Sequence, residues 1–104
     1  MGALKAAFIF LAPDSNPEKQ RTKAITPSVE LDVIPVNNYD EACRVAQELV
    51  SEGVVAIELC GGFGNIGVAK IVEAINGAVP VGVVRFDLHP GLNNKSGDVI
   101  FKNQ

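Results

Sequence analysis

The sequence has few of the residues that build metal centres and disulfide frameworks. Its 104 residues include two cysteines, one histidine, one tyrosine and no tryptophan. The spacing of Cys43 and Cys60 fits neither a zinc ribbon nor a disulfide framework. Because aromatic residues make up only 6% of the chain, the core must be built mainly from valine, isoleucine, leucine and alanine.

Positive charge is also scarce. Nine lysine and arginine residues are set against twelve aspartate and glutamate residues, which gives a net charge of −3. Nucleic-acid binding requires a basic surface, so we expect no nucleic-acid partner. The densest basic run, residues 19–23, is short and follows Glu18, as is typical of a solvated surface.

Long apolar runs and a signal peptide are absent as well. We therefore predict no membrane-spanning helix and no membrane partner, and we expect a cytoplasmic protein. The length fits one domain rather than two. Hydrophobic residues make up 47% and charged residues 20%, a composition typical of a globular domain with its own core.

Strands alternate with helices along the chain. Asn38 and Glu41 form a capping-box pattern at the start of the clearest helix. Residues 14–25 form either a short polar helix or a loop, and residues 99–101 are a candidate for a short extra strand. The expected strands cover residues 4–13, 28–36, 54–62 and 79–87, and the expected helices cover 38–53 and 65–76.

This alternation predicts a single α/β domain with a mainly parallel four-stranded sheet flanked by helices. Residues 7–11 are continuously apolar, as expected of a central strand. Residues 29–36 alternate between apolar and charged side chains and include Pro35, so we expect an edge strand with one face in water. The strand order 2-1-3-4 satisfies both expectations. The alternative order 1-2-3-4, half of a (βα)8 barrel, would leave the most apolar strand at an edge.

The expected ligand site lies where the chain reverses direction across the sheet. In the order 2-1-3-4 this point falls between the first and third strands, and open α/β sheets bind ligands outside the carboxyl ends of such strands. Residues 13–16 and 60–67 would flank the crevice. Glu58 lies just before the end of the third strand, and its carboxylate interrupts an otherwise apolar run.

Three glycines after the third strand, Gly62, Gly64 and Gly67, have the spacing G-x-G-x-x-G. This pattern lets backbone amides approach a phosphate at a helix N-terminus, but it also occurs in tight turns with close helix–strand packing. The chain is too short for both halves of a dinucleotide site, so we expect a small anion here. The expected ligand-binding residues are Gly61, Gly62, Gly64, Asn65 and Arg85.

Several residues near this turn are candidates for chemistry, and each has a structural alternative. Cys60 at a helix N-terminus would be a nucleophile or redox sensor, but a cysteine that ends a buried strand is also an ordinary apolar residue. Arg85, Asp87 and His89 would hold an anion and move a proton, or form only an ion pair beside a loop histidine. A metal site would have few ligands, so no metal is predicted and the cofactor stays unknown. The catalytic candidates are Glu58, Cys60, Asp87 and His89.

Four strings, "AAFIF", "TPSVEL", "AIELCGGFG" and "VPVGVVRFDLHPG", carry a resemblance over nearly the whole chain. With them the sequence resembles a family of short prokaryotic proteins classed as a domain of unknown function. This resemblance implies no activity and no catalytic residue. The strand–glycine–helix segments are also similar to pieces of phosphate-binding (βα)8 barrels, a likeness at the level of fold.

Two hypotheses of different classes follow. The first is a small-ligand-binding protein, or an enzyme, acting on a small substrate that carries phosphate or carboxylate. The second is an assembly module that works through homo-oligomerisation without small-molecule chemistry. Residues 79–86 are too apolar for an exposed edge, so we expect a homo-oligomer, most simply a dimer. An enclosed pocket beside Gly62 would favour the first hypothesis, and a shallow surface there the second.

Overall fold

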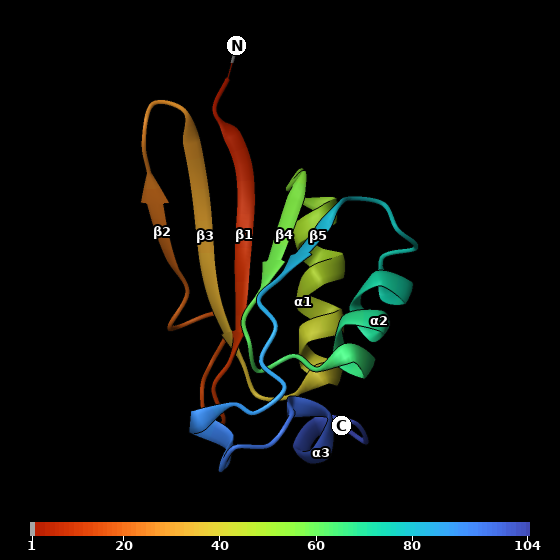
Figure 1. Ribbon diagram of the computed structural model, residues 1–104. Coiled ribbons are helices and arrows are strands. Elements are labelled where there is room, and N and C mark those ends of the chain that lie inside the picture. The colour runs from red at the N-terminus through yellow and green to blue at the C-terminus, as the bar shows by residue number, and fades with distance from the viewer. Residues whose placement is uncertain (1) are drawn as a thin grey trace.

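Five strands form one mixed sheet in the order β2-β3-β1-β4-β5 (Figure 1). The computed structural model describes residues 2–104, which form one α/β domain. The central strand β1 pairs in parallel with β3 and β4, β4 pairs in parallel with β5, and β2 pairs antiparallel with β3. The strands are β1 (Leu4–Leu11), β2 (Thr22–Ile25), β3 (Val29–Val36), β4 (Ala56–Leu59) and β5 (Val81–Val83).

Within the described residues, three α-helices and one short 3-10 helix complete the fold. Helix α1 (Tyr39–Ser51) links β3 to β4, and α2 (Asn65–Ala74) links β4 to β5. The 3-10 helix η1 (Pro90–Leu92) and α3 (Gly97–Phe101) follow β5 and lie beyond the carboxyl ends of the strands (Figure 1). None of the helices in residues 2–104 is long and apolar enough to cross a membrane.

The connections explain why both long helices lie on the same face of the sheet. The crossovers through α1 and α2 step across the sheet in one direction, and right-handed crossovers then place both helices on one face. The connection from β1 to β3 steps the other way, so a helix there would cover the other face. That connection contains β2 instead. Figure 1 shows α1 behind β4 and β5, and we call the opposite side of the sheet the uncovered face.

The core lies between the sheet and helices α1 and α2. Alternate residues of the central strands point into it, as the two-residue period of a strand requires. Ala7 and Ile9 of β1 are fully buried, and Ile9 is in register with the equally buried Ile34 of β3. The other core residues include Val36, Ala42, Val45, Ala46, Leu49, Ile57, Leu59 and Ile71.

Helix α1 begins as its sequence predicts. The side chain of Asn38 accepts a hydrogen bond from the amide of Glu41 at 2.8 Å, which confirms the predicted N-cap. The carboxylate of Glu41 in turn accepts one from the amide of Asn37 at 2.9 Å. Burial disfavours the charged form of Glu41, but hydrogen bonds from Asn37 and Arg44 outweigh it and lower the pKa of Glu41.

The observed sheet differs from the predicted one in strand number and at one edge. A fifth strand, β2, lies within residues 14–25. The prediction that residues 29–36 form an edge strand is wrong, because β2 pairs with β3 from Glu30 to Val33. Pro35 lies beyond the end of β2, so its missing amide leaves no gap there. The alternative order 1-2-3-4 is wrong, since β1 lies between β3 and β4.

The C-terminal part also departs from prediction. The fourth predicted strand, residues 79–87, is regular only over Val81–Val83. Residues 99–101 belong to helix α3 and not to an extra strand. Ser96 is the N-cap of α3, and its side chain accepts a hydrogen bond from the amide of Asp98.

Candidate functional site

The glycine turn after β4 is covered by the chain's own C-terminal helix. Gly62 and Gly64 are buried, and Gly64 is the N-cap of α2 without a side chain of its own to bind the free amides. The carboxylate of Asp98, from α3, accepts hydrogen bonds from the amides of Ile66 at 2.9 Å and Gly67 at 3.1 Å. A carboxylate is well placed there, because the helix dipole makes this end positive.

Tyr39 completes this network. Its hydroxyl donates to Asp98 at 2.8 Å and accepts from the amide of Gly64 at 3.0 Å. The amides of Gly64, Ile66 and Gly67 at the start of α2 are therefore already paired within the chain. Asp98 occupies the position in which we expected an external anion.

Close packing accounts for the glycines around this network. A Cβ atom on Gly67 would overlap the ring of Tyr39, and one on Gly64 would overlap the carboxylate of Asp98. A Cβ atom on Gly97 would overlap the carbonyl oxygen of Gly62. The surface beside Gly62 is thus occupied by α3, and tight helix–strand packing explains the G-x-G-x-x-G spacing.

Tyr39 gives a direct spectroscopic test of this network, because it is the only tyrosine. Burial, followed by its contact with Asp98, raises the pKa of Tyr39 above the usual value of about 10. We expect no phenolate absorbance while the protein is folded. The unfolded chain ionises above about pH 10, so stability should fall as pH rises from there. A reversible titration near the ordinary value, with the fold intact, would contradict the buried network.

Cys60 lies at the predicted switch point between β1 and β4. Its sulfur accepts hydrogen bonds from the amides of Leu11 and Gly62, both at 3.3 Å. The thiol therefore bridges the end of β1 and the turn after β4. Both cysteines, Cys43 and Cys60, are free thiols.

The structure brings together two of the predicted ligand-binding residues, Arg85 and Asn65. Its guanidinium donates to the side-chain oxygen of Asn65 at 3.3 Å and forms an ion pair with Asp87 at 3.0 Å. Both side chains of that ion pair are exposed, so it contributes little to stability. Arg85 and Asn65 border a cleft of about 140 Å³, which is also lined by Phe63, Val68, Val83 and Val84.

His89 has a structural role at the start of η1. Its Nδ1 accepts a hydrogen bond from the amide of Gly91 at 3.0 Å, and its ring packs on Phe86 with centroids 4.8 Å apart. Among residues 2–104 there is no group of three histidine, cysteine, aspartate or glutamate side chains that would hold a metal ion.

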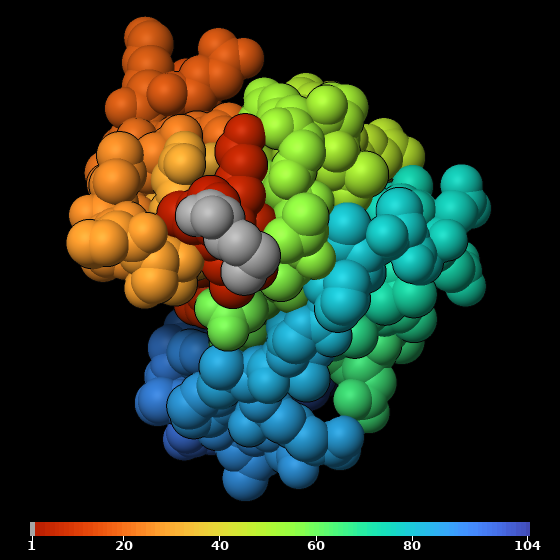
Figure 2. Space-filling model, turned by 90° about the horizontal axis from the view of Figure 1, so that it is seen from above, coloured from red at the N-terminus to blue at the C-terminus, as the bar shows by residue number. Residues whose placement is uncertain are grey.

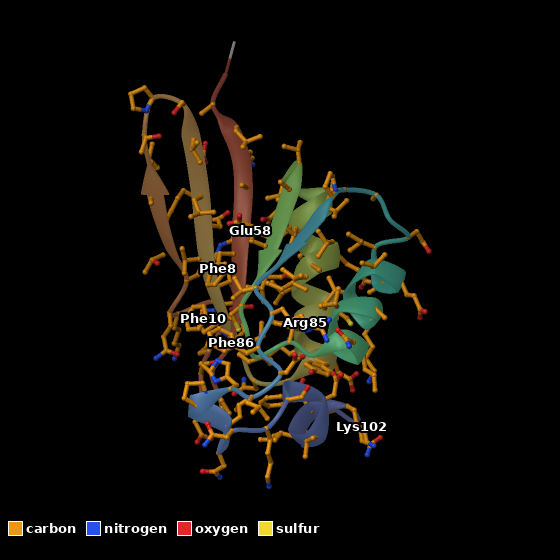
Figure 3. The ribbon with its side chains drawn as sticks, viewed as in Figure 1. Phe8, Phe10, Glu58, Arg85, Phe86 and Lys102 are labelled. Carbon is orange, nitrogen blue, oxygen red and sulfur yellow. The ribbon has the colours of Figure 1, made fainter. Side chains whose placement is uncertain are left out.

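Glu58 lies apart from the other candidates, on the uncovered face (Figure 3). It is in register with Phe8 of β1 and with Gly82 of β5, and its side chain is exposed. The predicted catalytic set is therefore not assembled in one place. Glu58 faces away from the helices, whereas Arg85 turns toward α2.

The uncovered face is apolar across the sheet. Phe8 and Phe10 of β1 stack with ring centroids 6.3 Å apart, and both are only half-buried. Among the strand residues that the structure describes on this face, Glu58 is the one charged side chain. The face consists of Thr22, Ala24, Val29, Leu31, Val33, Pro35, Leu4, Ala6, Phe8, Phe10, Ala56, Glu58 and Gly82.

The orientation of β3 was not predicted correctly. Its alternation suggested that the charged side would meet water, yet Asp32 is 2% exposed and pairs with Arg21 at 2.8 Å. The apolar side, with Leu31 and Val33, lies on the uncovered face. This face therefore has the composition of a buried sheet surface, although no helix of the described chain covers it.

Sequence reasoning missed both side chains that bind the glycine turn. Asp98 lies outside every strand and helix predicted from the sequence, and Tyr39 is an ordinary position in the predicted helix over residues 38–53. The string Ser96-Gly97-Asp98 is a helix N-cap signal that would have placed α3. No signal in the sequence links Asp98 to Gly67, 31 residues away.

Over residues 4–99 the chain matches the model of a family of unknown function (DUF6506). The chain belongs to this family, which confirms the resemblance drawn from its sequence strings. No curated protein and no solved structure matches the chain.

Proposed function

We propose that this protein is a cytoplasmic assembly module that forms a homodimer through the uncovered face of its sheet. The observation that carries the proposal is the reversed alternation of β3. Leu31 and Val33 face outward with Phe8 of β1, while Asp32 is turned inward and needs Arg21 to neutralise it. A strand oriented in this way gains stability only if its apolar side is also removed from water. The free thiols of Cys43 and Cys60 fit a reducing compartment.

The size of the face fits a second copy of the chain. The 27 strand residues, in strands about 4.8 Å apart with about 3.3 Å per residue, give the face a flat area of about 430 Å². Two such faces together have an area of about 860 Å², close to the lower bound of about 1,000 Å² for a specific interface. Homodimer interfaces are also more apolar than other protein surfaces, as this face is.

Val33→Lys tests the proposal by placing a charge in the middle of the face. Val33 is half-buried in the protomer, so a lysine there can extend to solvent until a partner covers it. We expect the dimer dissociation constant, measured by sedimentation velocity, to rise by about 100-fold or more.

Val72→Lys is the matched control. Val72 lies on α2, is 39% exposed and belongs to the other layer of the molecule. We expect this variant to dimerise like the wild type, with the same circular dichroism. Equal effects of the two substitutions, or a wild type that stays monomeric at millimolar concentration, would overturn the proposal.

A second candidate is the binding of a small carboxylate or phosphate at the cleft beside Arg85. The hydrogen bond from Arg85 to Asn65 favours this candidate, because both residues were predicted to bind an anion. The local charge counts against it, since Asp87 and Asp98 together outweigh the single guanidinium. Thermal stabilisation by phosphate or acetate that disappears in Arg85→Ala, at constant ionic strength, would support this candidate. No stabilisation of the wild type would exclude it.

A further inference from the structure

Glu58 is the one polar interruption near the middle of the uncovered face (Figure 3). Gly82, its neighbour on β5, has no side chain to pack against it, although a Cβ atom there would lie 3.9 Å from the Glu58 side chain, an ordinary contact distance. On the other side Glu58 is in register with Phe8. The carboxylate therefore stands on an apolar surface and is solvated only because nothing lies over it.

No neighbouring group compensates this charge. β1 presents Phe8 to Glu58 and β5 presents Gly82, while Ala56 and Cys60 flank it along its own strand. Within the described residues, the thiol of Cys60 is the only titratable group among these neighbours. The cations on the neighbouring part of the sheet, Lys5, Arg21 and Lys23, are directed to its opposite side. There Lys5 binds the carbonyl oxygen of Glu52, and the other two pair with Asp32.

Covering this carboxylate with a second apolar sheet would remove its water without supplying a partner. An unpaired charge in such a place costs several kcal/mol, whereas the protonated carboxyl costs far less. A group in this situation takes up a proton instead of remaining charged.

We propose that Glu58 makes the association of two chains proton-dependent, so that each Glu58 carboxylate binds a proton from solvent as the uncovered faces meet. This inference rests on the proposed dimer and names the group that regulates it. Association releases no other proton in this scheme, and no bond to carbon is made or broken.

Linkage fixes the direction of the effect. The dimer holds protons that the separate chains do not, so acidification favours the dimer. With up to two protons bound per dimer, the dissociation constant falls by up to about 100-fold per pH unit lowered, above the range in which carboxyl groups ordinarily titrate. The dimer is thus weak at neutral pH and tight in mildly acidic solution.

Glu58→Gln provides the test, because glutamine has the same shape and no charge. We expect wild-type dissociation constants, from sedimentation velocity at constant ionic strength, to fall at least about tenfold between about pH 7.5 and about pH 5.5. In Glu58→Gln the dimer should be tight at both values, with less than about a twofold change.

His89→Gln is the control, because histidine is the residue type whose charge ordinarily changes between about pH 5 and 8 and His89 is the only one in the sequence. This variant should keep the wild-type pH dependence. If it loses that dependence, or if Glu58→Gln weakens the dimer, Glu58 is not the proton-binding group and the inference fails. A wild type that dimerises equally at all pH values would overturn the inference and leave the proposed dimer standing. A wild type that does not dimerise at any pH overturns both.

Discussion

Asp98→Ala is expected to lower the free energy of unfolding by about 3 kcal/mol, the largest loss we predict for any single side chain. The substitution leaves the hydroxyl of Tyr39 and the amides of Ile66 and Gly67 without their acceptor. It also removes a negative charge from the positive end of α2. Urea denaturation monitored by circular dichroism measures the loss.

Asp87→Ala is the matched control for this prediction. Asp87 is also a carboxylate near the start of α2, but its side chain is 76% exposed and binds only Arg85. Its removal should change stability by less than about 0.5 kcal/mol. Similar losses in the two variants would show that Asp98 is not the cap of α2.

The vacated site in Asp98→Ala should also bind an external anion. Two helix amides and the hydroxyl of Tyr39 remain to receive it. We expect about 0.1 M sulfate to restore roughly 1 kcal/mol to the variant beyond its general effect on the wild type. Equal stabilisation of both proteins would mean that the turn has no anion-binding capacity even when Asp98 is absent.

Gly97→Ala is expected to lower the free energy of unfolding by about 3 kcal/mol, nearly as much as Asp98→Ala but for a different reason. The added methyl group would overlap the carbonyl oxygen of Gly62, and backbone atoms cannot rotate away as a side chain can. The helix α3 must therefore shift, and the bonds of Asp98 are lost with it. Thermal and urea denaturation of the variant measure this loss.

Gly61→Ala is the control for Gly97→Ala, because its added methyl group would overlap a side chain and not the backbone. Its methyl group would meet the ring of Phe86, which is 41% exposed and free to rotate outward. We expect a loss of about 1 kcal/mol or less. A loss equal to that of Gly97→Ala would contradict the assignment of Gly97 to a rigid contact.

Local signals in the sequence predict much of the fold. The apolar run of β1 marks a central strand, and Asn38 with Glu41 marks the start of α1. The start of α1 depends on residues close together in the chain, and the central position of β1 depends on burial that is uniform along the strand. The α/β class follows from the alternation of such segments.

Features that depend on distant residues escaped prediction. β2 is a strand because it pairs with β3, although its own four residues are all exposed and show no alternation. From the sequence, Asp32 is expected to face solvent. In the structure it is buried, because Arg21 lies 2.8 Å from it and neutralises its charge. The cap formed by Asp98 depends on how α3 folds back over α2, which no local pattern specifies.

Strand β1 lies in the middle of the uncovered face, beside β4. Seen from above, the hairpin of β2 and β3 and the segment after β5 lie toward different sides of the molecule (Figure 2). Between them the face presents β1 and β4 with Phe8 and Glu58. A second sheet of the same shape would meet an apolar surface with one carboxylate in it.

The most direct test is a nuclear Overhauser experiment on a mixture of labelled and unlabelled chains at mildly acidic pH, filtered for contacts between protomers. We predict contacts from the rings of Phe8 and Phe10 to the methyl groups of Leu31 and Val33 in the other chain. Contacts found only along β5, or on α2 around Val72, would contradict the claim that the uncovered face joins two copies of this protein.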